Sequence, residues 1–102
     1  SNEDCIMITR FFILKSKRLL TLSKIFEINK NIDLTISSAK PAIFWKEKDI
    51  TKQQVQRWSS IKIKHLIFSL SETELQIKKN VNNSINIITD FILNQFSEET
   101  NI

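Results

Sequence analysis

The stretch that decides the fold is residues 4–28, DCIMITRFFILKSKRLLTLSKIFEI. Its apolar residues recur at spacings of three, four and seven, which place them along one side of an α-helix. No glycine or proline interrupts the stretch, and cations including Arg10 and Arg18 cover much of the rest. The β-branched and aromatic run from Ile6 to Leu14 is also compatible with a strand. The spacing favours one long helix from about Asp4 to Ile28.

Two shorter helices are expected next in the chain. Asn31 is a suitable N-cap for a short helix that continues to Ile36. Lys40–Pro41 should close this helix, because a residue that precedes proline disfavours the helical region. Asp49 is then predicted to cap a helix that ends at Trp58.

Two more helices are expected in the C-terminal half. Ser59 and Ser60 are candidate caps for a helix over 61–79, and Asn80 should end it, since asparagine tolerates the left-handed conformation. Asn83–Ser84 then restarts a helix that continues to Phe96, and the polar tail 97–102 is expected to fray. The sequence therefore predicts an all-α protein, a helical bundle of about five helices.

The length of 102 residues is expected to form a single domain, residues 1–102. Ser1–Asn2 resembles what tag cleavage leaves, and a start without methionine indicates a fragment of a longer chain. No apolar run is long enough for a membrane span, and no signal peptide is visible. We expect a cytoplasmic protein, and its single cysteine suits a reducing compartment.

The composition excludes several kinds of chemistry. The chain has no glycine, so it cannot contain a Gly-rich phosphate-binding loop. Cys5 is the only cysteine and His65 the only histidine, which excludes an internal disulfide and a histidine-rich metal site. An enzyme built on a Cys5–His65 nucleophile pair stays open, but nothing in the sequence positions the two residues together. We expect no catalytic residue, no cofactor and no metal.

The charge is modestly basic and unevenly distributed. Fifteen lysines and arginines against eleven acids give a net charge of +4. A strong bias to isoleucine, lysine and asparagine is typical of an AT-rich genome, which weakens the argument for a polyanionic partner. Residues 40–65 nevertheless carry seven cations and two anions. A small basic helical nucleic-acid-binding domain is therefore the alternative function, and its possible phosphate contacts are Lys46, Lys48, Lys52, Lys62 and Lys64, together with Arg57.

The segment Pro41–Lys46, PAIFWK, is the most unusual part of the chain. Its aromatic residues Phe44 and Trp45, together with Trp58, would pack into the core or form a subunit interface. Stacking on the bases of a single strand is the less favoured reading of the same residues. Farther along, Glu74 and Lys78 are four residues apart on a predicted helix, which favours an ion pair between them, although one of the two could instead reach a neighbouring subunit.

The order of several segments resembles a known family. A basic long helix (Thr9–Phe12, then Arg18–Leu20) is followed by Lys40–Lys46, by a helix end at Gln56–Ser59, and by Leu70–Lys78 with its Glu-x-x-x-Lys spacing. This order is similar to that in the C-terminal domain of the delta subunit of bacterial DNA polymerase III, a clamp-loader component. The match covers roughly residues 8–93. It departs from the family where Asn80–Val81 stands in place of the usual glycine.

The resemblance implies a role in bacterial DNA replication. In that family the C-terminal domains of five subunits form a helical collar, which holds together the modules that load the sliding clamp onto primed DNA. The implied partners are the gamma/tau and delta-prime subunits. The sliding clamp would be bound only through the N-terminal region that this chain lacks. Contacts with DNA would be indirect or weak, and no contact with a membrane is expected. The chain would then be part of a subunit of the DNA-directed DNA polymerase III holoenzyme, and the chain itself would have no active site. The expected interface residues are Phe44, Trp45, Arg57, Trp58, Glu74 and Lys78.

Overall fold

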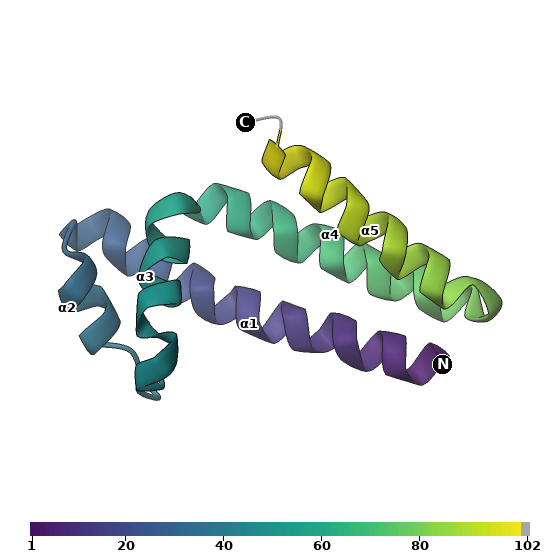
Figure 1. Cartoon of the computed structure of the whole chain (residues 1–102), viewed down its shortest axis with the longest axis horizontal. Coiled ribbons are helices and arrows are strands. Elements are labelled where there is room, and N and C mark those ends of the chain that lie inside the picture. Colours follow the sequence, from purple (N-terminus) through teal and green to yellow (C-terminus); the bar gives the residue numbers. More distant parts are fainter. Residues whose placement is uncertain (101–102) are drawn as a thin grey trace. The chain divides into compact units, whose positions relative to one another are not determined.

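The computed structural model describes the backbone of residues 1–100 and the side chains of residues 1–95, and this part of the chain is helical with no strand. The all-α fold with five α-helices is as predicted. The helices, coloured along the chain in Figure 1, are α1 (Asn2–Asn29), α2 (Ile32–Ser37), α3 (Lys48–Arg57), α4 (Ser60–Lys79) and α5 (Ser84–Thr100). Two short 3-10 turns, η1 (Trp45–Glu47) and η2 (Val81–Asn83), precede α3 and α5.

The ends of α1 and α2 follow from local capping. α1 stops at Lys30, whose φ of 58° places it in the left-handed region and whose N–H donates to the Phe26 carbonyl at 2.8 Å. Lys30 is the one non-glycine residue with positive φ among the described residues, and the chain has no glycine to take this position. The predicted cap of α2 is confirmed, because the Asn31 side chain accepts a hydrogen bond from the Leu34 N–H at 3.0 Å.

Two predicted helix boundaries are wrong in detail. α3 begins at Lys48, one residue before the expected cap Asp49, and Glu47 at the cap position makes no side-chain capping bond. Asp49 instead lies in the first turn of α3, where its negative charge interacts favourably with the positive end of the helix dipole. α4 does end before Asn80, but Asn80 has φ of −128° and not a left-handed conformation. The chain leaves α4 through the 3-10 turn η2, so no left-handed residue is needed there.

The beginnings of α4 and α5 match the prediction. The Ser59 hydroxyl accepts a hydrogen bond from the Lys62 N–H at 3.2 Å, as an N-cap does. α5 starts at Ser84, as expected. α5 continues to Thr100, four residues beyond the expected end at Phe96, so the backbone of residues 97–100 is helical where we expected a frayed tail. Positions 101–102 of that tail lie outside the described residues.

The chain divides into two compact units, and both include part of α1 and part of α4. Unit 1 consists of residues 1–13 and 68–102, and unit 2 of residues 14–67. In unit 2 the core joins α1, α2, the following loop and α3. Its buried residues are Leu22, Ile36, Ala39, Ile43 and Val55, with Leu19, Phe26 and Ile32 packed against them.

Unit 1 has a smaller set of buried side chains. Leu70 and Ile77 of α4 and Cys5 of α1 are buried there, so Cys5 behaves as a small apolar residue. The Ser84 hydroxyl donates to the Asn2 side chain at 2.6 Å, which joins the first turns of α5 and α1. The apolar stripe predicted for α1 is only partly buried. In unit 1 its residues Ile8, Phe11 and Phe12 are about half exposed.

Candidate interaction surfaces

The aromatic residues of the 41–46 segment lie on the surface of unit 2. Phe44 is 54% exposed and Trp45 is 69% exposed, so neither is part of the core. Their ring centroids are 5.9 Å apart with a tilt of 51°, and the Lys46 ammonium lies 5.3 Å from the centroid of the Trp45 ring. The two rings form one apolar projection, here called the aromatic loop (Phe44 and Trp45).

The backbone on both sides of the aromatic loop is held by unit 2. Ile43, directly before the two rings, is buried in the core. The Arg18 guanidinium of α1 donates to the Pro41 carbonyl, and the Glu47 N–H donates to the Phe44 carbonyl at 2.8 Å. The loop is therefore ordered by its own unit while its aromatic side chains remain in solvent. A pre-ordered apolar projection loses little conformational entropy when it enters a partner's pocket.

Trp58 occupies a different position, at the corner between α3 and α4. It is half-buried, and its carbonyl accepts a hydrogen bond from the Ser23 hydroxyl of α1 at 3.1 Å. The Lys62 ammonium lies 5.7 Å from the centroid of its ring. Arg57, next to it, is exposed. Trp58 thus contributes to the structure of the corner, whereas Arg57 is accessible to a partner.

A carboxylate from α1 caps the first turn of α4 at the same corner. Glu27 accepts two hydrogen bonds from Ser60, from the backbone N–H at 3.1 Å and from the hydroxyl at 2.8 Å. These bonds favour the charged carboxylate and lower the pKa of Glu27 from its ordinary value, with smaller contributions from Lys30 and Lys64. Sequence analysis did not find this contact. The only sequence feature that could have indicated it is the pair of polar residues Ser23 and Glu27, which lie one helical turn apart in a largely apolar helix, and this feature is not specific.

Glu74 lies in an ion-pair network within unit 1. Its carboxylate is 2.8 Å from the Lys78 ammonium, which confirms the predicted pair, and 3.3 Å from Nε of Arg10. The Lys78 hydrogen bond is the main cause that lowers the pKa of Glu74, and Arg10 acts in the same direction. The Glu74 side chain is only 17% exposed. Glu74 therefore joins α4 to α1. Its contact with Arg10 links residues 64 positions apart in the sequence, so spacing within one helix could not predict it.

The five lysines proposed for phosphate contacts do not form one basic face. Lys52 is paired with Asp33 of α2 at 2.8 Å, which raises the pKa of Lys52. Lys46 and Lys62 lie over tryptophan rings, and Lys48 and Lys64 are exposed. On α4, Lys62 and Lys64 flank the buried Ile63, and residues two apart on a helix point in different directions.

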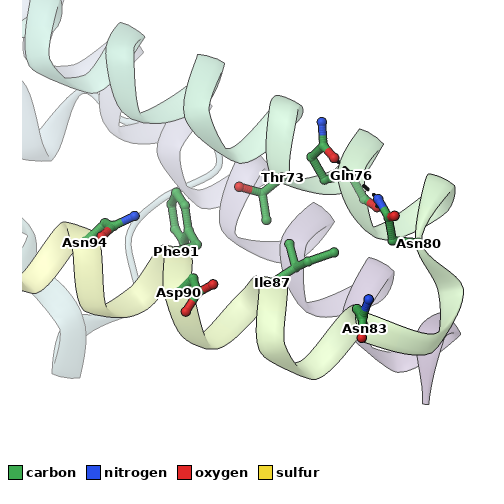
Figure 2. Close-up of a pocket in the computed structure, with 8 residues that line it drawn as sticks. All are labelled: Thr73, Gln76, Asn80, Asn83, Ile87, Asp90, Phe91 and Asn94. Carbon is green, nitrogen blue, oxygen red and sulfur yellow. Dashed lines mark hydrogen bonds between the residues drawn. The ribbon is translucent and has the colours of Figure 1, made fainter.

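A cleft of about 420 Å³ lies between α4 and α5 in unit 1. Figure 2 shows side chains from both helices around it, with Ile87 and Phe91 contributed by α5. Four of the lining residues are amides, namely Gln76, Asn80, Asn83 and Asn94. Asp90 is the single carboxylate in the lining, and it has no histidine or cysteine beside it. Amides can donate and accept hydrogen bonds, but this set contains no nucleophile with an activating base.

The described residues show no constellation for catalysis or metal binding. Cys5 is buried in unit 1, and His65 is exposed in unit 2. Among residues with described side chains, no group of three or more histidine, cysteine, aspartate or glutamate residues could hold a metal ion. Within the same part of the chain, no helix combines the length and apolarity required to span a membrane.

Comparison with known proteins adds no further constraint, since no family model, no curated protein and no solved structure matches this chain. The assignment of function therefore depends on the residue order described above and on the surfaces of the two units.

Proposed function

We propose that this chain is a non-catalytic oligomerisation domain, and specifically the collar domain of a bacterial DNA polymerase III delta subunit. In this role it helps to hold together the clamp loader, which places the sliding clamp on primed DNA. The partners are the gamma/tau and delta-prime subunits. The proposal combines the order of segments along the sequence with the apolar surface of the folded chain, and it implies a cytoplasmic location.

The aromatic loop is the observation that carries the proposal. Phe44 and Trp45 are exposed, yet the backbone around them is fixed by Arg18 and by buried Ile43. A soluble chain gains nothing in stability from two large rings in water, whereas aromatic residues are frequent anchors in protein interfaces. The loop also lies in Lys40–Lys46, one of the ordered segments that carry the resemblance to the delta-subunit family.

A second apolar surface on α1 supports an oligomeric role. Four large apolar residues close together on the unit 1 part of α1 are roughly half exposed or more, and these are Met7, Ile8, Phe11 and Phe12. Side chains of this size present on the order of several hundred Å² of apolar surface together, which is at the upper end of what monomers expose. A collar subunit has two neighbours and needs two contact surfaces that are not equivalent.

The other proposed interface residues take different parts. Arg57 is exposed and can form a direct contact, and Lys78 is partly exposed at its ion pair with Glu74. Trp58 and Glu74 are held by contacts within the chain: the Trp58 carbonyl accepts from Ser23, and the Glu74 carboxylate pairs with Lys78 and Arg10. We therefore assign direct contact to Phe44, Trp45 and Arg57, and a supporting role to Trp58 and Glu74.

The proposal is tested by binding of the full chain to the gamma/tau and delta-prime subunits from the same organism. Analytical ultracentrifugation or calorimetry should detect a complex with at least one of them. Trp45→Ala should weaken that complex by about tenfold or more, because a central aromatic anchor contributes about 2 kcal/mol or more to binding. Phe68→Ala is the matched control, since Phe68 of α4 is also an exposed aromatic residue, at 67%.

Two outcomes would contradict the assignment. One is that folded protein, checked by circular dichroism, binds neither subunit at tens of micromolar. The other is a complex that Phe68→Ala weakens as much as Trp45→Ala does, because the aromatic loop would then have no special part in it.

A further inference from the structure

A basic groove in unit 2 has no part in the proposed collar contacts. It has a volume of about 440 Å³ and lies between α1 and the segment that follows α2. The Lys17 and Arg18 side chains of α1 and Lys40, just before Pro41, border it. The apolar residues Leu22, Ile25 and Ala39 also line it, and two of them, Leu22 and Ala39, belong to the buried core.

The cations of the basic groove have no acidic partner. No carboxylate among the described side chains lies within ion-pair distance of Lys17, Arg18 or Lys40. Elsewhere in the same unit a lysine is paired, because Lys52 lies 2.8 Å from Asp33. Three uncompensated positive charges around one cavity produce a local field that attracts an anionic group.

The groove holds one of these cations in a fixed position. The Arg18 guanidinium is half-buried and donates to the Pro41 carbonyl, which leaves further N–H donors of its planar fork for a ligand. The hydroxyls of Thr21 and Ser38, which also line the groove, donate to the Lys17 and Thr35 carbonyls. The donors toward a ligand are therefore the cations.

We propose that this basic groove binds an acidic peptide segment, one that carries a large apolar side chain between aspartate or glutamate residues. The carboxylates would pair with Lys17, Arg18 and Lys40, and the apolar side chain would pack on Ile25, which is only half-buried. This use of the groove is independent of the collar assignment, because it involves none of the residues to which we assign interface contacts.

The lining distinguishes a peptide from a nucleic acid. Single-stranded nucleic acids bind through aromatic side chains on which the bases stack, together with cations for the phosphates. No aromatic residue lines the basic groove, and its apolar surface is aliphatic. A small inorganic anion would satisfy the cations but leave the Ile25 side chain uncovered. An acidic and apolar peptide matches both parts of the lining, and its size fits a cavity of a few hundred Å³.

The test measures binding of fluorescein-labelled peptides to the full chain by anisotropy. The probe is a short peptide in which glutamate and leucine alternate, compared with one that has glutamine for glutamate and one that has serine for leucine. A labelled oligothymidine of similar length reports nucleic-acid binding. We expect the acidic, leucine-containing peptide to bind most tightly. Its affinity should fall as salt rises from about 0.1 M to about 1 M, where charges are screened.

Variants of the protein locate the site. Lys17→Gln combined with Lys40→Gln should weaken the peptide by about tenfold, since two charge-assisted contacts are removed. Lys48→Gln combined with Lys64→Gln is the matched control, because it removes the same charge from exposed positions of the same unit. It should leave the affinity within about twofold. Circular dichroism checks that both double variants keep their helices.

The proposal is overturned if no peptide binds, if both double variants weaken the peptide equally, or if loss of leucine has no effect. It is also overturned if the oligothymidine binds more tightly than the peptide and loses affinity in the Lys17 and Lys40 variant, since the groove would then be a nucleic-acid site.

Discussion

The Glu27 carboxylate and Ser60 are joined by two hydrogen bonds, of 3.1 Å to the backbone N–H and 2.8 Å to the hydroxyl. Ser60 is the first residue of α4, so a side chain of α1 caps a helix that begins 33 residues later in the sequence. A negative charge at this end of a helix is favourable, because the first N–H groups have no partner within the helix and the dipole is positive there.

This contact predicts a pH dependence of stability. The pKa of Glu27 is lowered in the folded chain, so its contribution is fully present above the unfolded-state pKa and is lost as pH falls through the folded-state pKa. Between about pH 5 and about pH 3, the free energy of unfolding should therefore fall more steeply for the parent chain than for Glu27→Gln. Urea titrations at several pH values measure the difference. Glu72→Gln, an equal charge change on the exposed side of α4, should keep the parent's slope.

The Glu74 network should contribute modestly to unit 1. We expect Arg10→Gln and Glu74→Gln to show a coupling of between about 0.2 and 1 kcal/mol in a double-mutant cycle, because the Arg10 side chain is largely exposed and the pair is screened by solvent. The coupling should decrease in high salt. A coupling near zero would mean that Glu74 is held by Lys78 alone.

Lys30 offers a route to a more stable protein. Its left-handed conformation is costly for a residue with a Cβ atom and costs little for glycine. Lys30→Gly should therefore raise the free energy of unfolding by about 0.5–1 kcal/mol, after allowance for the greater freedom of glycine in the unfolded chain. Lys30→Ala keeps the Cβ atom and should give no such gain. Equal effects of the two changes would exclude this explanation.

Ile61 and Ile63 of α4 provide a matched pair for the core of unit 2. Ile63 is 0% exposed and Ile61 is 66% exposed. Ile63→Ala should destabilise the chain by about 2–5 kcal/mol, because it leaves a cavity, whereas Ile61→Ala should change stability by no more than about 0.5 kcal/mol. Chemical denaturation of both variants measures the contrast, and similar losses would show that α4 packs through a different side.

The sequence was a good guide to the helices because their boundaries depend on neighbouring residues. Asn31, Ser59 and Ser84 lie where helices begin, and each has a side chain suited to a first turn. In α4, Ile63 and Ile77 are fully buried, whereas Leu75 is exposed. The cap predicted at Asp49 was two residues too late, because the 3-10 turn η1 leads directly into α3 and places Glu47 at the cap position.

Features that depend on distant residues were not predictable in the same way. The partners of Glu27 and of Glu74 come from segments 33 and 64 residues away, and no local pattern specifies them. A left-handed residue was expected at Asn80, but the chain leaves α4 through the 3-10 turn η2 and Asn80 is not left-handed. The left-handed residue is Lys30, at the end of α1. The basic groove was missed for a related reason, since it brings Lys40 beside Lys17 and Arg18 only after α2 turns back.

The contrast between the two tryptophans has a practical consequence. Trp45 projects into water, whereas Trp58 is half-buried at the α3–α4 corner and its backbone is held by Ser23. Indole fluorescence depends on the polarity around the ring, so each tryptophan is a spectroscopic reporter of a different event. In a Trp58→Phe background the emission would follow partner docking, and in a Trp45→Phe background it would follow unfolding, with no label attached to the chain.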